Sequence, residues 1–238
     1  GATDLAVTPS RALVRSYNGR MATPVPNVLL TGFEPFGGEP VNPSWDAVSA
    51  LHGRRIGGCR IAARRQPVEF GASLKALRTA IRETKPRLAL CVGQAGGRSA
   101  ISIERVAINV DAAPIPDHAG PPPIDTPVVA GGPPAYFSTL PVKAMLDALR
   151  AQDIPAEISQ TAGTYVCNHV FYGLMHALRA RRRIRAGFVH VPYSPQQVQG
   201  HSGAPSLPLD VMVEALRVMV RVALETKVDK RIAAGTEH

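Results

Sequence analysis

The sequence predicts one α/β domain with helices on both faces of a central sheet. Three observations support this prediction. Short apolar segments of strand length alternate with segments whose apolar residues recur at helical spacing. The segment 88–93 is continuously apolar, as expected for a central strand that is buried on both faces. The length of 238 residues suits a single domain, and the sequence contains no internal repeat.

The domain is expected to begin after a short leader. Residues 1–26 mix Thr, Ser, Pro and Gly without periodicity, so we expect a poorly ordered leader there, a single domain over 27–230 and a tail over 231–238. Asn42 is a predicted N-cap, with Pro43 at the first helical position. Further helices are expected over 74–85, 141–152, 167–178 and 209–228, and strands over 28–32, 61–68, 88–93, 101–108, 156–159 and 186–192.

One long segment is expected to contain no regular structure. Residues 112–134 hold eight prolines, which exclude a helix or a central strand because proline lacks a backbone donor. The segment is therefore predicted to be a long ordered loop or lid.

The charge of the chain allows two interpretations. The formal net charge is +9, and five arginines lie within 179–185. One interpretation is contact with nucleic acid or another polyanion. The other is a solvated helix C-terminus, where cations complement the carbonyl groups. No aromatic residue that would stack on a base lies between these arginines, so the second is favoured and no nucleic-acid partner is expected.

Cysteine usage indicates a reducing compartment. Cys59, Cys91 and Cys167 are few, odd in number and widely separated, which argues against a disulfide framework. No Cys and His residues have the spacing of a zinc site, so no metal is expected. The sequence has no apolar run long enough to span a bilayer and no secretory signal, so we expect a cytoplasmic protein without a membrane partner.

Cys167 is the first candidate for catalysis. A turn of small residues, 161–164, leads directly into an amphipathic pattern, which places this thiol in the first turn of a helix. Unpaired backbone N–H groups and the helix dipole favour a thiolate there, and the thiolate is the form that attacks carbonyl carbons. The alternative is an inert buried cysteine.

His190 and Glu104 are candidate partners of this thiol. His190 lies near the carboxyl end of an apolar strand, where open α/β sheets carry their sites. Glu104 is a carboxylate within an otherwise apolar strand and needs a partner. That partner is either His190, as in a catalytic triad, or a cation such as Arg105. Phe33 and Phe36 follow the first strand in a turn-rich loop and are expected to wall a small apolar pocket.

Four segments of the chain carry long motifs. They are LTGFEPFGG (30–38) with NPSW (42–45), GQAGGR (93–98) with IERVAIN (103–109), SQTAGTYVCN (159–168) and FVHVPY (188–193). These motifs resemble the signatures of the pyroglutamyl peptidase I family, also called pyrrolidone-carboxylate peptidases. The resemblance covers residues 28 to about 225 in order, and such long motifs are specific in combination.

This resemblance implies a fold, an activity and residue roles. The fold is a three-layer α/β/α sandwich with a mixed, mostly parallel sheet. The activity is removal of an amino-terminal pyroglutamyl residue from peptides by a cysteine peptidase without a cofactor, in a homo-oligomer such as a dimer or tetramer. The implied catalytic residues are Cys167 as nucleophile, His190 as general base and acid, and Glu104 as orienting carboxylate. The implied substrate-binding residues are Phe33, Phe36, Gln94 and Tyr165.

One position departs from the family pattern. Pro114 stands where the family usually has an arginine that lies close to the site and holds the oxyanion. Loss of one such donor costs about 10²–10³ in rate, so slow turnover is expected unless Arg98 or the backbone N–H of Cys167 takes over. The rival hypotheses are a catalytically impaired relative that binds pyroglutamate or a similar lactam, and the polyanion binder that rests on charge alone.

Overall fold

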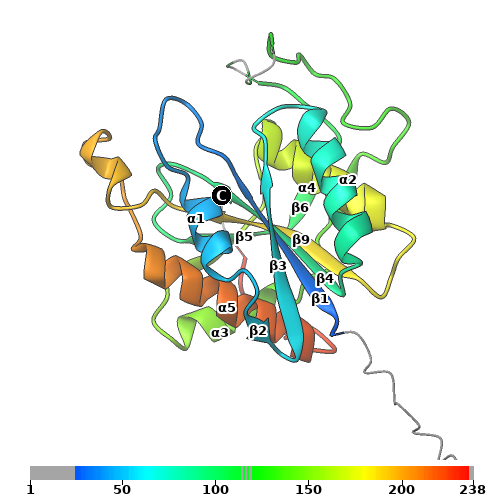
Figure 1. The fold of residues 1–238 in the computed structure, drawn as a ribbon, viewed down its shortest axis with the longest axis vertical. Coiled ribbons are helices and arrows are strands. Elements are labelled where there is room, and N and C mark those ends of the chain that lie inside the picture. The colour runs from blue at the N-terminus through cyan, green and yellow to red at the C-terminus, as the bar shows by residue number, and fades with distance from the viewer. Residues whose placement is uncertain (1–24, 114, 116, 118–119, 236–238) are drawn as a thin grey trace, which may run out of the picture.

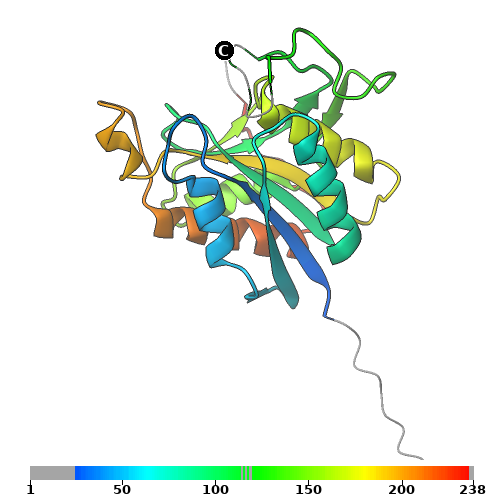
Figure 2. The same ribbon diagram turned by 45° about the horizontal axis from the view of Figure 1, so that its top comes forward.

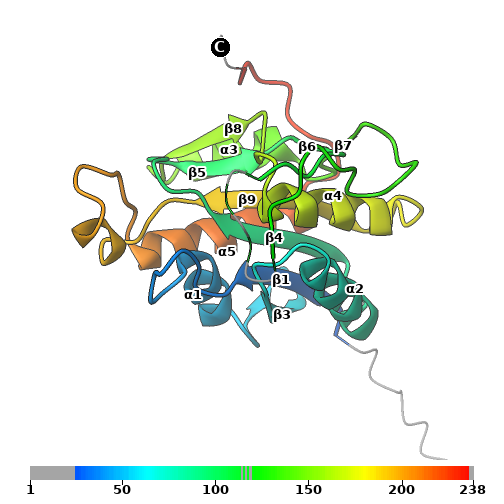
Figure 3. The same ribbon diagram turned by 90° about the horizontal axis from the view of Figure 1, so that it is seen from above.

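The structure is a computed structural model that describes residues 25–113, 115, 117 and 120–235. Within these residues, seven strands form one mixed sheet in the order β2-β3-β1-β4-β9-β5-β8 (Figure 3). Most neighbours are parallel, and only the β2–β3 and β5–β9 pairs are antiparallel. The strands are β1 (Asn27–Phe33), β2 (Arg55–Ile56), β3 (Cys59–Gln66), β4 (Leu88–Gln94), β5 (Ile101–Glu104), β8 (Ala156–Ser159) and β9 (Arg185–Val191).

Helices cover both faces of this sheet, so the predicted three-layer α/β/α fold is confirmed. Figure 1 shows α1, α3 and α5 on one side of the sheet and α2 and α4 on the other. The helices are α1 (Pro43–Ala50), α2 (Ala72–Thr84), α3 (Val142–Arg150), α4 (Val166–Leu178) and α5 (Leu209–Glu225).

The central strands separate two apolar cores. In β4, Leu90 and Val92 face the core beneath α1, α3 and α5, whereas Ala89 and Cys91 face the core beneath α2 and α4. This alternation follows from the period of two along a strand. It also places Gly93, the next residue on the α4 face, beneath the start of α4.

Most expected elements are confirmed, with shifted ends. The predicted N-cap is present, since Asn42 Oδ1 accepts a hydrogen bond from the Ser44 backbone N–H at 3.1 Å. The expected strand over 101–108 is wrong as one element. Its first part is β5, and the chain then leaves the main sheet at Arg105 to form β6 (Val106–Ile108), which pairs with β7 (Ala135–Phe137) in a separate two-stranded sheet.

The proline-rich segment is a loop, as predicted, in the part of 112–134 that the structure describes. Figure 2 shows this segment, in green, outside the three layers. It is held against the α4 side by the Ala112 backbone N–H, which donates to the Thr164 carbonyl at 3.0 Å, and by the Tyr172 hydroxyl, which donates to the Pro133 carbonyl at 2.7 Å. Pro114 and almost all of the expected leader, residues 1–24, lie outside the described residues.

The C-terminal helix is shorter than predicted, because α5 ends at Glu225 and not at residue 228. The following segment returns to α3, which has no side-chain cap of its own. There the Asp229 carboxylate accepts from the backbone N–H groups of Lys143, at 3.2 Å, and Ala144, at 2.9 Å. A residue beyond the last helix therefore stabilises the unpaired N-terminus of α3.

Candidate active site

The carboxyl ends of three parallel strands meet at one edge of the sheet. Phe33 ends β1, Gln94 ends β4, and His190 lies one residue before the end of β9. This edge is where open α/β sheets bind ligands. The predicted position of His190 at such an end is therefore confirmed.

Cys167 faces this edge from the first turn of α4. The helix begins at Val166 without a side-chain cap, so the backbone N–H of Cys167 has no partner among the described residues. The thiol lies directly over Gly93, since a Cβ added to that glycine would be 2.8 Å from Cys167 Sγ. Gly93 is in register with His190 on the neighbouring strand, so the thiol lies over the sheet beside the imidazole, on the face to which His190 points.

His190 is held by Glu104 from β5. Its Nδ1 lies 2.7 Å from Glu104 Oε1, and both side chains are buried. Because a carboxylate oxygen accepts, Nδ1 carries the proton and Nε2 keeps a free lone pair. The same oxygen accepts from Arg98 Nη1 at 2.8 Å. Glu104 therefore has both partners weighed above, the histidine and a cation, and that cation is Arg98 and not Arg105.

The surroundings set the resting protonation of the pair. Burial lowers the pKa of His190, and the Arg98 charge lowers it further. The hydrogen bond to Glu104 acts in the opposite direction and raises this pKa. Burial raises the pKa of the Cys167 thiol to about 12, and the Glu104 carboxylate raises it too, whereas Arg98 lowers it. Burial and Glu104 therefore oppose the thiolate that the helix start was expected to favour, and a helix N-terminus contributes at most about 2 kcal/mol in its favour. The directions of both pKa shifts favour a neutral thiol and a neutral imidazole in the resting pair.

A small pocket of about 120 Å³ opens beside the thiol. This volume is far below the roughly 300–1,000 Å³ of sites for drug-sized ligands, so the pocket suits one small ring. Phe36 and Phe70 both contact the Tyr165 ring. Their ring centroids lie 5.4 Å and 5.5 Å, respectively, from the centroid of Tyr165. The lining residues are Phe33, Phe36, Asn42, Val68, Gln94, Tyr165, Val166 and Cys167.

All of the substrate-binding residues predicted from the sequence line this pocket, but one was assigned to the wrong local structure. Phe33 was expected in a loop and instead ends β1, where it is buried against Phe188 at a centroid distance of 6.5 Å. Sequence reasoning missed Val68, Asn42 and Val166 as lining residues. The position of Val68 just after β3, in line with the end of β1, is the signal that could have revealed it.

Two other histidines near the nucleophile have structural partners. His169 Nδ1 lies 2.7 Å from Asp111 Oδ2, and its Nε2 accepts from the Gly71 backbone N–H at 3.0 Å. His176 Nδ1 lies 2.9 Å from the Tyr136 hydroxyl. Each imidazole is therefore held by a partner other than the Cys167 thiol.

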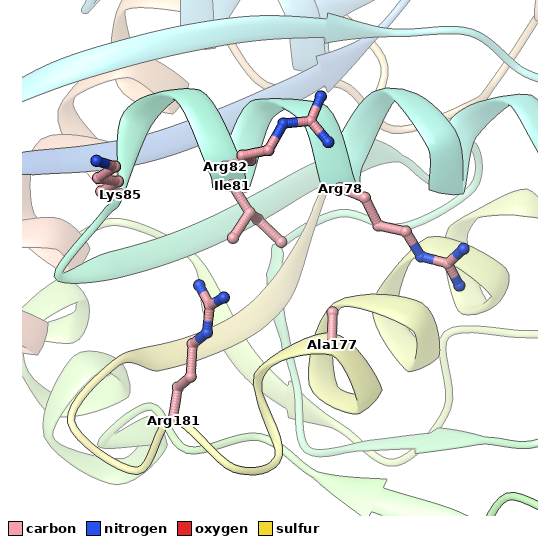
Figure 4. A pocket seen from close by; sticks show the side chains of 6 residues that line it. All are labelled: Arg78, Ile81, Arg82, Lys85, Ala177 and Arg181. Carbon is pink, nitrogen blue, oxygen red and sulfur yellow. The ribbon is translucent and has the colours of Figure 1, made fainter.

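A larger hollow of about 480 Å³ lies between α2 and α4, away from the thiol. Figure 4 shows Arg78, Arg82, Lys85 and Arg181 around it. Both helices end beside this hollow, where cations complement the last carbonyl groups. Arg179 acts in the same way, since its Nη1 donates to the His176 carbonyl at 2.7 Å. The arginine-rich segment thus agrees with the helix C-terminus interpretation.

Two further features of the described residues bear on partners. No group of three or more His, Cys, Asp or Glu side chains among them is arranged to hold a metal ion. None of the helices in that part of the chain is long and apolar enough to cross a membrane.

An α/β/α fold in which a thiol lies beside an imidazole, and a buried carboxylate holds that imidazole, has the arrangement used by cysteine hydrolases. The family model for pyroglutamyl peptidase matches residues 26–226. The chain therefore belongs to the pyroglutamyl peptidase family.

Individual relatives agree with this assignment. The chain is 57% identical to a pyrrolidone-carboxylate peptidase of Erwinia tasmaniensis over 89% of this chain and 99% of that protein. It is 55% identical to a pyrrolidone-carboxylate peptidase of Cupriavidus taiwanensis, over 90% of this chain and 100% of that protein. The crystal structure of pyroglutamyl peptidase I from Bacillus amyloliquefaciens is similar at a TM-score of 0.85 and 46% identity, over 87% of this chain and 99% of that chain. A mutant pyrrolidone carboxyl peptidase from Pyrococcus furiosus matches at a TM-score of 0.81 and 44% identity, over 84% and 98%.

The protonation states lead to a prediction for cysteine labelling. Iodoacetamide should label Cys167 before Cys59 and Cys91, because Cys167 is partly exposed and the other two are buried. With a thiol pKa of about 12, the thiolate fraction and hence the labelling rate should rise about tenfold per pH unit from pH 6 to 9. The rate is measured by mass spectrometry of the labelled peptides. A rate that is constant over this range would instead reveal a preformed thiolate–imidazolium pair.

Proposed function

We propose that this chain is a cysteine peptidase that removes an amino-terminal pyroglutamyl residue from peptides. The observation that carries this proposal is the small aromatic pocket whose wall includes the Cys167 thiol. A five-membered lactam fits between flat rings, and it presents a carbonyl and an N–H in place of a charged amine. The family to which the chain belongs supports the same substrate class.

Acylation starts with transfer of the thiol proton. As Cys167 Sγ attacks the pyroglutamyl carbonyl carbon, its proton passes to His190 Nε2, which the Glu104 hydrogen bond leaves unprotonated. The carboxylate then stabilises the imidazolium that forms. His190 returns the proton to the leaving amine as the C–N bond breaks, which leaves a thioester on Cys167 and a shortened peptide.

Deacylation repeats these steps with water. His190 accepts a proton from the water that attacks the thioester carbonyl, and the C–S bond breaks. Pyroglutamate leaves, and His190 returns the proton to Cys167 Sγ. The neutral thiol and the neutral imidazole of the resting state are restored, so no cofactor is consumed.

The best donor for the oxyanion is a backbone N–H group in the first turn of α4. The backbone N–H of Cys167 is unpaired among the described residues and belongs to the nucleophile itself. Arg98 was the other donor considered, but its guanidinium already donates to Glu104, at 2.8 Å, and to the Thr161 carbonyl, at 3.2 Å. We therefore assign the oxyanion contact to Cys167 and not to Arg98.

Specificity against ordinary amino termini follows from charge. The residues described as lining the pocket include no carboxylate that would pair with an ammonium group. Burial of an unpaired ammonium group is costly, so a peptide with a free terminal amine should be excluded. A lactam is neutral and avoids this cost.

Hydrolysis of a chromogenic pyroglutamyl amide tests the proposal. Wild type should release the chromophore, and Cys167→Ser should lower kcat/KM by about 10⁴-fold or more because the nucleophile acts as a unit with His190. The melting temperature of the variant should stay close to that of wild type. Binding of pyroglutamate without turnover by wild type would favour the impaired lactam-binding relative.

Phe36 and Phe33 should separate binding from stability. Phe36→Ala removes a half-buried loop ring and should raise KM roughly tenfold with little loss of stability. Phe33→Ala truncates a buried residue of β1 and should also lower the free energy of unfolding by about 3–5 kcal/mol. KM from initial rates and urea unfolding give the two quantities. Equal stability losses would contradict the distinction between the two rings.

Two expectations from the resemblance stay predictions. Pro114→Arg should raise kcat more than it changes KM, because an oxyanion donor acts mainly in the transition state. An unchanged or lower kcat would mean that the oxyanion needs no cation at that position.

Association into a dimer or tetramer is the second expectation, and sedimentation velocity tests it.

A further inference from the structure

Gln197 lies behind the pocket and has a fixed orientation. It belongs to a short 3₁₀ turn, Gln197–Gln199, in the loop after β9, and its side chain is buried. Its Oε1 accepts a hydrogen bond from the Ser194 backbone N–H at 3.1 Å. A backbone N–H can only donate, so this contact identifies which end of the Gln197 amide is the oxygen.

The amino end of Gln197 points toward acceptors from two other segments. Its Nε2 donates to Gln94 Oε1 at 3.0 Å. The same nitrogen lies 3.4 Å from the Val41 carbonyl oxygen and 3.4 Å from Glu39 Oε2. The Val41 carbonyl and the Glu39 carboxylate only accept, so a reversed Gln197 amide would lose both of these contacts as well as the one to Ser194.

The acceptor at Glu39 is itself held in place. Glu39 Oε1 lies 2.6 Å from His201 Nε2, and the His201 ring stacks on Tyr193 with centroids 4.6 Å apart. The loops before α1 and after β9 are therefore joined behind Gln197. This connection limits rotation of the Gln197 side chain.

The orientation of Gln197 determines that of Gln94. Since Gln197 donates, Gln94 must turn its oxygen toward it and its amino group away. Gln94 lines the pocket, and no described residue accepts a hydrogen bond from its Nε2. The polar group that Gln94 offers to a ligand is therefore a donor.

We propose that Gln197 is a positioning residue that makes the pocket selective for a ring with a carbonyl acceptor. This inference rests on the proposed function, and it assigns the specificity for a lactam carbonyl to a residue that does not line the pocket. Without Gln197, the Gln94 amide can turn either its oxygen or its amino group toward the pocket. An unbiased amide would lose part of its hydrogen bond to the ring carbonyl, which is worth about 0.5–1.5 kcal/mol.

The test is a double-mutant cycle with Gln197→Met and Gln94→Met. Gln197→Met should lower kcat/KM for a pyroglutamyl amide about two- to tenfold, mainly through KM. Inhibition by the cyclopentanecarbonyl amide, whose ring has no carbonyl, should not change. Gln197→Met should have no further effect in the Gln94→Met background, because it acts through Gln94.

Two controls separate positioning from general loss of structure. Gln199→Met changes an exposed glutamine of the same turn and should leave both compounds unaffected. The iodoacetamide labelling rate of Cys167 should be the same in all variants. As a second variant, Gln197→Glu keeps the Ser194 contact but accepts from Gln94, and should also raise KM for the pyroglutamyl amide.

The outcomes distinguish the two proposals. Independent, additive effects of the two methionine substitutions, or equal losses for both compounds, would overturn the role of Gln197 alone. Absence of any turnover or binding of a pyroglutamyl compound by wild type would overturn the proposed function, and the lactam assignment with it.

Discussion

The carboxylate of Glu104 is the group on which the geometry of the site depends. It is fully buried at the end of β5, and an unpaired charge there would cost several kcal/mol. Arg98 and His190 both bind its Oε1, so one oxygen balances the charge and selects the imidazole tautomer. The free Nε2 lone pair of His190, and with it the path of the Cys167 proton, follows from this shared contact.

Much of the site could be predicted because its residues lie at the ends of recognisable elements. The small-residue turn before Cys167 predicted a helix start, and the apolar strand before Pro192 predicted the position of His190. Glu104 was identified because a carboxylate in an apolar strand needs a partner. These are local signals, and the α/β alternation then places the ends of β1, β4 and β9 at one edge. Glu104 reaches His190 from the antiparallel strand β5.

The parts that could not be predicted depend on long-range contacts. The thiol pKa depends on burial and on Glu104, which lies 63 residues earlier, and both act against the local helix start. Phe33 looked like a loop residue because Pro35 and the following glycines are typical of a turn, so the end of β1 could not be recognised from the sequence. The Gln94–Gln197 contact joins residues 103 positions apart, and nothing in either local sequence indicates the pairing.

The most direct test of this account is to trap the covalent intermediate. Wild type is mixed with a reactive pyroglutamyl ester, quenched in acid during turnover and digested for mass spectrometry. The account predicts one pyroglutamyl group as a thioester on the peptide that contains Cys167, and its loss in Cys167→Ser. Steady turnover with the acyl group on another residue, or unchanged turnover by Cys167→Ser, would contradict it.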